Sequence, residues 1–256
     1  MSSNEHIEGE ILFESENHKF IWLGADSKQK AGVIQTNQYL IINNGKGILL
    51  DPGGVHLFSR VVSVASRFID LEHIEAIFFS HQDPDVSSGI ALWLGVTPAR
   101  IYVSGLWLRF LPHFGVIDQE RIEAIEDDGG EMTIGSGAKL KFIPSHFLHS
   151  TGNFSLYDET SGILFSGDIG AAAFKEGEQY LYVEDFDTHL SRMEGFHKRY
   201  MTNNRACKDW VNRVSKYSVS MVAPQHGAVL KEDQVQKFFS WMKDLQCGTD
   251  LLDSLS

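Results

Sequence analysis

The stretch of the sequence most suggestive of chemistry is "FFSHQDPDVSSG", residues 78–89, in which His81, Asp83 and Asp85 occupy alternate positions directly after an apolar run. Alternate side chains of an extended segment point the same way, and Pro84 is expected to keep this segment out of a helix. Taken alone, such a triplet is more often a solvated loop than a set of metal ligands. Its interpretation therefore depends on the rest of the chain.

Three other strand-like segments also run directly into histidine or aspartate. "FIPSHFLH" contains His146 and His149, "LFSGD" ends in Asp168, and "VAPQHG" contains His226. Sites commonly gather at strand ends, because rigid strands aim the side chains and loops leave room for a ligand. Carboxylates held together repel one another, and one or two divalent cations would relieve that repulsion. The combined pattern predicts a metal site.

The elements that would position these residues are short apolar strands and amphipathic helices. Strands are expected to begin at Phe20, Gln38, Gly47, Ala76, Arg100, Lys139, Asn153, Gly162 and Val219. Helical periodicity covers residues 55–68, 89–94, 104–110, 190–200, 205–217 and 234–245. The last of these helices keeps its apolar residues on one face, which should cover a sheet: Val235, Phe238, Phe239, Met242 and Leu245. We therefore predict an α/β fold with two sheets in the middle and helices outside.

Length and composition limit the classes of protein to which the chain can belong. The 256 residues contain no repeat or linker, so we expect a single domain over residues 1–256, with ends at 1–8 and 248–256 that fray. A formal charge of -12 repels phosphate backbones and anionic lipid, so neither nucleic acid nor a membrane is an expected partner. The N-terminus lacks the pattern of a signal peptide, which predicts a cytoplasmic protein.

The two cysteines, Cys207 and Cys247, are far apart in the sequence and form no CxxC motif. This spacing favours ordinary reduced thiols over a zinc, iron–sulfur or redox site. The chain therefore shows no electron carrier of its own.

The order and spacing of His81, Asp83, Asp85, His149, Asp168 and His226 resemble those of the metallo-β-lactamase superfamily. Within it, the chain most resembles the diiron domain of flavodiiron proteins and the stand-alone oxygen-binding diiron proteins related to them. "NQYLIINNGKGILLDPGG" looks like the family's second hairpin with its Asp-Pro-Gly turn, and "LFSGDIG" and "APQHG" look like its later signatures. The resemblance covers nearly the whole chain and implies a four-layer αββα sandwich.

The resemblance also implies a set of metal ligands. Carried over residue by residue, it assigns His81, Asp83 and His149 to one iron. It assigns Asp85 and His226 to the other iron, with Asp168 bridging the two. Three carboxylates and three imidazoles suit iron or manganese, and zinc also accepts such ligands. The expected cofactors are therefore two non-haem iron ions, with no catalytic residue assigned beyond the ligands themselves.

Two positions depart from the superfamily patterns. Hydrolases typically carry HxHxDH, and here Asp83 and Val86 replace two of its histidines. Flavodiiron proteins carry HxExDH, in which the last histidine is not a direct iron ligand, so valine is tolerable there. Asp83 is one methylene shorter than the usual glutamate, which shortens its reach. Val86 therefore argues against zinc hydrolysis.

Several further residues could surround the metals. His146 is the rival of His149 on the same strand exit, and could steer or donate to a bound ligand. Tyr200 and Trp107 could flank the site, although packing is the simpler role for both. The resemblance gives Asp51 a structural role in the turn beneath the metals. The remaining histidines are expected at the surface or at caps: His6, His18, His56, His73, His113, His189 and His197.

Three functions are compatible with this site. The first is a sensor that holds O2, or NO, as a long-lived bound species and reports to a signalling protein. The second is an O2 or NO reductase subunit supplied with electrons by a donor protein, because the sequence shows no flavodoxin-like domain and hence no FMN site. The third is a metal-dependent hydrolase. Family members often dimerise, so a homodimer is also expected.

Overall fold

The computed structural model describes residues 8–24, 34–175 and 178–254. The chain divides into two compact units. The first consists of Met1–Val103, Trp107–Ala124 and Thr133–Ala138, and the second of Ser104–Leu106, Ile125–Met132 and Lys139–Ser256.

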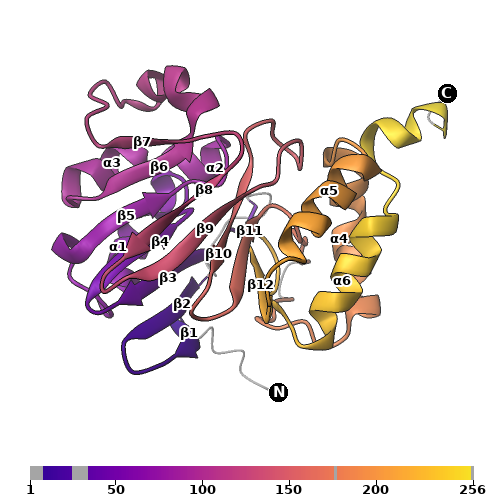
Figure 1. Ribbon diagram of the computed structural model, residues 1–256, viewed down its shortest axis with the longest axis horizontal. Helices are drawn as coiled ribbons and strands as arrows, with labels where there is room; N and C mark the ends of the chain where they lie inside the picture. Colours follow the sequence, from indigo (N-terminus) through magenta and orange to yellow (C-terminus); the bar gives the residue numbers. More distant parts are fainter. Residues whose placement is uncertain (1–7, 25–33, 176–177, 255–256) are drawn as a thin grey trace. The chain divides into compact units, whose positions relative to one another are not determined.

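The first unit is built on a seven-stranded sheet in which the strands follow one another in chain order (Figure 1). The strands are β1 (Glu10–Glu14), β2 (His18–Gly24), β3 (Gln38–Asn43), β4 (Lys46–Leu50), β5 (Ile74–Phe78), β6 (Arg100–Ser104) and β7 (Ile122–Ile125). Strands β1 to β4 pair antiparallel, whereas β4, β5 and β6 run parallel. The carboxyl ends of β4 and β5 therefore lie at the same edge of this sheet.

Helices pack against this sheet, and the apolar side chains of the helices and the sheet form one buried cluster. The α-helices are α1 (Phe58–Ala65), α2 (Pro84–Ser87) and α3 (Ile90–Val96), and the 3₁₀ helices are η1 (Val55–Leu57), η2 (Leu71–His73) and η3 (Gly105–Phe114). Val61 of α1 and Trp93 of α3 are fully buried together with Leu40, Leu49 and Ile77 of the sheet. Burying large apolar side chains stabilises each of these contacts by about 1.5–3 kcal/mol per residue.

The second unit contains a six-stranded sheet with the order β13-β12-β11-β10-β9-β8. Its strands are β8 (Gly130–Ile134), β9 (Ala138–Pro144), β10 (Phe154–Asp158), β11 (Ile163–Gly167), β12 (Met221–Pro224) and β13 (Leu230–Lys231). Only the β11–β12 pair is described as parallel, and the other described pairs are antiparallel. Residues that follow β11 and β12 consequently emerge at one edge.

Three amphipathic helices pack on this second sheet, α4 (Phe186–Tyr200), α5 (Asn204–Val214) and α6 (Asp233–Asp244) (Figure 1). The side chains of Asp185 and Asn203 cap α4 and α5 by accepting hydrogen bonds from backbone N–H groups. The apolar face predicted for 234–245 is confirmed, because all five of its apolar side chains are buried. None of the described helices is long and apolar enough to cross a membrane.

The structure confirms an α/β fold with two sheets and helices, and corrects several details. Pro84 does not exclude a helix; it occupies the first position of α2, where its missing N–H costs nothing. Of the residues 104–110 that were expected to form a helix, Ser104 ends β6 and residues 105–110 lie in the 3₁₀ helix η3. Strands β1, β7, β8 and β13 were not predicted. The stretch 248–256, expected to fray, contains the 3₁₀ helix η4 (Gly248–Ser254).

Candidate metal centre

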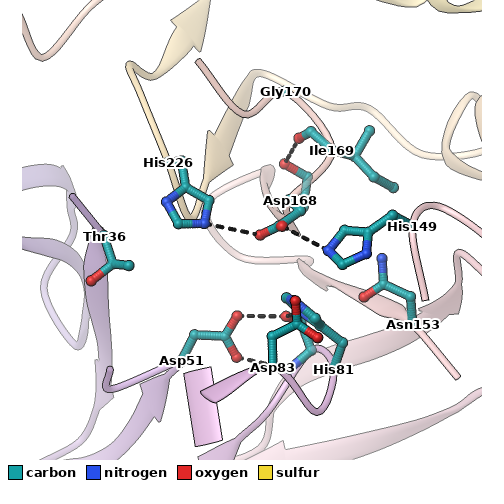
Figure 2. Close-up of polar contacts among 12 residues, drawn as sticks. Thr36, Asp51, His81, Asp83, His149, Asn153, Asp168, Ile169, Gly170 and His226 are labelled. Atoms are coloured by element: carbon teal, nitrogen blue, oxygen red, sulfur yellow. Dashed lines mark hydrogen bonds and ion pairs between the residues drawn. The ribbon is translucent and has the colours of Figure 1, made fainter. Parts of the chain in front are cut away.

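In the first unit, hydrogen bonds join Asp51 to Ser80 and Ser80 to His81. Asp51 and His81 are labelled in Figure 2. Asp51 follows β4, and Ser80 and His81 follow the neighbouring parallel strand β5. One carboxylate oxygen of Asp51 accepts the Ser80 backbone N–H at 2.7 Å, and the other accepts the Ser80 hydroxyl at 2.5 Å. The Ser80 Oγ lies 2.8 Å from His81 Nδ1.

This hydrogen-bond chain fixes the tautomer of His81. The single hydroxyl proton of Ser80 is donated to Asp51, so Ser80 Oγ must accept the proton that His81 carries on Nδ1. The lone pair of the imidazole then lies on Nε2. A histidine ordered in this way is typical of a metal ligand whose far nitrogen is held by a supporting group. Asp51, which is fully buried, thus has the structural role expected of it.

Asp83 and Asp85 follow His81 in the chain, at the start of α2. The Oδ2 atom of Asp83 is 3.8 Å from His81 Nε2, and Asp83 is the N-terminal flanking residue of α2. Asp85 occupies the first turn of that helix, where the helix dipole favours a carboxylate. Val86 is fully buried and packs in the core of the first unit.

In the second unit, the Asp168 carboxylate lies between two histidines (Figure 2). Asp168 follows β11 and His226 follows the parallel neighbour β12, whereas His149 comes from the loop after β9. His149 Nε2 is 2.9 Å from Asp168 Oδ2, and His226 Nε2 is 3.4 Å from Asp168 Oδ1. Each carboxylate oxygen therefore faces a different imidazole.

This arrangement is the one expected of a bridging carboxylate. Nitrogen and oxygen ligands bind first-row metals at about 2.0–2.2 Å, so two ligand atoms on one ion lie roughly 3 Å apart. Both contacts of Asp168 are close to that separation. A carboxylate with one histidine at each oxygen can serve two ions, one through each oxygen. The chemistry of these donors, imidazole nitrogen and carboxylate oxygen, suits iron, manganese or zinc.

His197 of α4 forms a hydrogen bond with the turn that carries Asp168. The Gly170 N–H donates to His197 Nε2 at 2.9 Å, and His197 Nδ1 lies 2.9 Å from the Met193 carbonyl. Because Nε2 accepts, the ring must carry its proton on Nδ1 and donate it to Met193. Gly170 has a φ of +99°, a conformation that favours glycine. His197 is thus a support of the turn that the sequence reasoning missed.

The expectation that the remaining histidines lie at the surface or at caps is wrong for His18, His189 and His197, which are buried, and His6 lies outside the described residues. Burial lowers the pKa of His197 to about 4, and burial lowers the pKa of His189 to about 4 as well. His189 Nδ1 is 2.6 Å from the Tyr180 hydroxyl. The two histidines share the buried face of α4 with Phe186 and Met193, and that helical spacing was the available sequence signal.

Aromatic side chains of α4 pack against His149. The rings of Phe196 and Tyr200 lie edge-on to its imidazole, with centroids 6.0 and 5.9 Å away. These two rings also stack on each other at 4.7 Å. Tyr200 therefore lies next to a candidate ligand, whereas Trp107, in the first unit, contacts Phe110.

His146 and His149 have different partners although they leave the same strand. His146 Nε2 donates to the backbone carbonyl of Asp127 at 2.6 Å, and the His146 ring lies edge-on to Phe154. His149, by contrast, faces Asp168. The structure thus groups His149 with Asp168 and His226, and groups His81 with Asp83 in the first unit.

The two sheets with their helices and the histidine and aspartate groups at strand ends define a metallo-β-lactamase-like protein. Residues 34–227 match the family described as "ODP family beta lactamase". The chain belongs to this family, which confirms the superfamily to which its sequence motifs point.

Solved structures of similar proteins support the same fold. The chain is 54% identical to a structure described as "Peroxy diiron species of chemotaxis sensor ODP", with a TM-score of 0.88 over 98% of this chain and 100% of the other. It is 53% identical to the apo state of chemotaxis sensor ODP from T. denticola, with a TM-score of 0.89 and the same shares covered. A flavo di-iron protein from Thermotoga maritima shares the fold at 22% identity, with a TM-score of 0.78 over 92% of this chain and 60% of that one.

Curated relatives include flavodiiron enzymes. The anaerobic nitric oxide reductase flavorubredoxin of Enterobacter sp. (strain 638) is 26% identical over 82% of this chain and 45% of its own length. The chain spans about half the length of the curated relatives it matches.

Proposed function

We propose that this protein is a non-haem diiron protein that binds O2, with NO as a further ligand, and that it acts as an oxygen sensor. The observation that carries this proposal is the Asp168 carboxylate with one histidine at each oxygen. The family gives it support, because the chain resembles over nearly its whole length a chemotaxis sensor whose structure is described as a peroxy diiron species.

Six residues hold the irons in this proposal. His81, Asp83 and His149 would bind one ion, Asp85 and His226 would bind the other, and Asp168 would bridge them. Their side chains supply imidazole nitrogens and carboxylate oxygens, which are suitable ligands for iron. Manganese and zinc also accept such ligands, and measurement of the metal content distinguishes the three metals. With three protein ligands on the second ion, coordination positions stay open for a diatomic gas.

When bound, a pair of ferrous ions supplies the electrons and open coordination positions that O2 requires. The residues of the chain hold that pair in place. Asp51 and Ser80 keep the Nε2 lone pair of His81 available. His197 fixes the Asp168 turn through Gly170. Phe196 and Tyr200 place ring surface beside His149.

A sensor also needs a partner that reads its state. We propose a signalling protein whose affinity for this chain differs between the reduced and the O2-bound forms, because a ligand that did not change that affinity would carry no signal. We place the protein in the cytoplasm, in keeping with its two free cysteines. Assembly as a homodimer stays a prediction.

The first experiment measures the metal content of protein purified without oxygen, followed by optical spectra as one equivalent of O2 is added without reductant. We expect about two irons per chain and a visible absorption band that persists after the addition. The Asp168→Ala variant, treated in the same way, is the matched control and should give no band. Zinc in place of iron, or a native protein without a spectral response to O2, would contradict the proposal.

A second candidate is a gas reductase subunit that receives electrons from another protein. It is favoured by the similarity to a nitric oxide reductase flavorubredoxin, of which this chain spans less than half. Sustained consumption of O2 or NO in the presence of an added flavoprotein reductase would support it, and a single turnover would favour the sensor. Hydrolysis is the least supported function, because Val86 is buried in the core and provides no metal-binding nitrogen.

A further inference from the structure

The second unit contains a pair of cysteines that the metal centre does not use. Cys207 lies in the first turns of α5, and Cys247 lies in the irregular segment between α6 and η4. Although 40 positions separate them in the chain, their sulfur atoms are 3.8 Å apart. Both side chains are buried, and both thiols are free.

Hydrogen bonds hold together the two segments that carry these thiols. The Asp250 carboxylate accepts the backbone N–H of Cys247 at 3.1 Å and that of Asn204, at the start of α5, at 2.6 Å. It therefore fastens the Cys247 segment to the helix that carries Cys207. The chain neighbours Gln246 and Lys208 are exposed, whereas both cysteine side chains are fully buried.

Only a small movement separates this contact from a covalent bond. The sulfur atoms of a disulfide are about 2.05 Å apart, so the pair must close by roughly 2 Å. Cys207 is fixed within a helix, whereas Cys247 lies in a segment without regular hydrogen bonding that can supply the movement. The neighbouring Asp250 contacts limit how far the segment can turn away.

The two sulfur atoms have unequal roles. The hydrogen bond between the two sulfur atoms lowers the pKa of the Cys247 thiol and raises the pKa of the Cys207 thiol. Cys247 is therefore the more readily ionised thiol. Because the thiolate is the nucleophilic form, Cys247 is the sulfur that reacts first with an oxidant.

We propose that Cys207 and Cys247 form a redox site that hydrogen peroxide converts to an intramolecular disulfide and that a thiol reductant restores to the two free thiols. The Cys247 thiolate attacks one peroxide oxygen, the O–O bond breaks, and Cys247 becomes a sulfenic acid while the other oxygen leaves as water after protonation. The Cys207 sulfur then displaces the sulfenic hydroxyl group as a second water. Two thiols are oxidised by two electrons in total, and one hydrogen peroxide is reduced to two water molecules.

Formation of this disulfide would affect the loop that carries His149. Thr249, two residues after Cys247, donates its backbone N–H to the Thr202 carbonyl at 2.8 Å. Thr202 in turn donates its N–H, at 3.2 Å, and its hydroxyl, at 2.8 Å, to the carbonyl of Phe147. The disulfide would fix the segment that contains Cys247 and Thr249, at one end of this series of hydrogen bonds. Phe147, at the other end, lies two residues before His149.

The test treats the reduced full-length protein with hydrogen peroxide, removes the excess with catalase, and alkylates remaining thiols under denaturing conditions before intact-mass measurement. We expect untreated protein to carry two alkyl groups and oxidised protein to carry none, with the mass lower by two hydrogen atoms. After digestion with trypsin, the peptide 206–208 should be linked to the peptide 244–256. Dithiothreitol should restore both alkylations.

Single variants identify the order of the steps. Cys207→Ala should trap a sulfenic acid on Cys247 that reacts with dimedone, whereas Cys247→Ala should give little or none on Cys207. Alanine is chosen because it keeps a small apolar side chain in the core. A melting temperature near that of the unsubstituted protein would establish that each variant is folded.

Other outcomes would overturn the proposal. In the first, both thiols can still be alkylated after peroxide treatment. In the second, the disulfide forms between two chains, and in the third, a cysteine is oxidised directly to sulfinic acid. The experiment is repeated on protein stripped of metal with a chelator, since the reaction needs only the two thiols and peroxide. A disulfide that forms only in metal-loaded protein would also contradict it. Because this test does not depend on iron, its failure is distinct from failure of the diiron proposal.

Discussion

The two units support their candidate ligands in different ways. In the first unit, His81 is oriented through Ser80 by the buried carboxylate of Asp51, all within residues that follow two adjacent strands. In the second unit, Asp168 faces His149 and His226 directly. Its support comes from a helix far along the chain, through the bond between His197 and Gly170. The first arrangement sets a tautomer, and the second sets the position of a bridge.

The largest expected effect comes from removing the bridge. Asp168→Ala should lose both metal ions together, because this carboxylate is proposed to serve both. His226→Ala should chiefly empty the second site and leave about one ion per chain. Metal analysis of anaerobically purified protein measures the difference. Equal loss in the two variants would mean that the ligands are not divided between the ions as proposed.

The support of the second unit should also depend on pH. His189 and His197 have pKa values near 4 in the fold, against about 6.5 when unfolded. Between these values the unfolded chain binds protons that the folded chain excludes, so stability falls as the pH drops from about 6.5 toward 4. Each histidine can contribute at most about 3 kcal/mol, at 1.36 kcal/mol per pKa unit.

Urea unfolding of metal-free protein at several pH values measures this loss. His189→Phe serves as the comparison, because it removes one titrating group and leaves the bond between His197 and Gly170 in place. Its stability should fall less steeply than that of the unsubstituted protein over the same pH range. An unchanged slope would show that His189 is not kept neutral by burial.

Variants of the Asp51–Ser80–His81 hydrogen bonds in the first unit should have smaller effects than those in the second unit. The contributions of Asp51 and Ser80 can also be measured separately. Asp51→Asn replaces the carboxylate that accepts both Ser80 hydrogen bonds, and should destabilise the fold by about 1–3 kcal/mol. Ser80→Ala keeps the backbone bond to Asp51 and removes the hydroxyl that bonds to both Asp51 and His81. It should lower metal affinity by about 10–100-fold, as the loss of a group supporting a ligand typically does.

Calorimetric titration with ferrous iron under argon, together with thermal melts, separates these two effects. Ser80→Thr retains a hydroxyl and is the matched control for Ser80→Ala. A Ser80→Ala variant that binds iron as tightly as the unsubstituted protein would show that the tautomer of His81 needs no help from Ser80.

The sequence alone could predict the strands, the main helices and the family of this protein, because local patterns carry that information. Short apolar runs marked β2 to β6, and the five apolar side chains on one face marked α6. Strand β13, with only two residues, and β8, with exposed positions, offered little pattern. Pro84 was misjudged because proline disfavours helix interiors but suits a helix start.

The candidate ligands could be proposed from their spacing, but their supports could not. Ser80 looks like an ordinary loop serine until strand pairing brings it next to Asp51, 29 positions away. His197 looks like one charged helix residue among its neighbours Lys198 and Arg199. Its role depends on a turn 27 positions earlier in the chain, which only the packing of α4 reveals. Long-range hydrogen bonds of this kind leave no local periodicity.

The smallest expected effect concerns Tyr200, which packs on His149 yet is 56% exposed. Tyr200→Phe keeps the ring stacked on Phe196 and removes only the hydroxyl, so stability should change by less than about 0.5 kcal/mol. If Tyr200 acts only by packing, the lifetime of the O2-induced absorption band should also be unchanged, while Tyr200→Ala should shorten it by admitting water beside His149. A shorter lifetime in Tyr200→Phe would instead give the hydroxyl a direct part in retaining the gas. That result would shift the comparison between the units, because α4 would then supply a functional group to the ligand and not only support for the bridge.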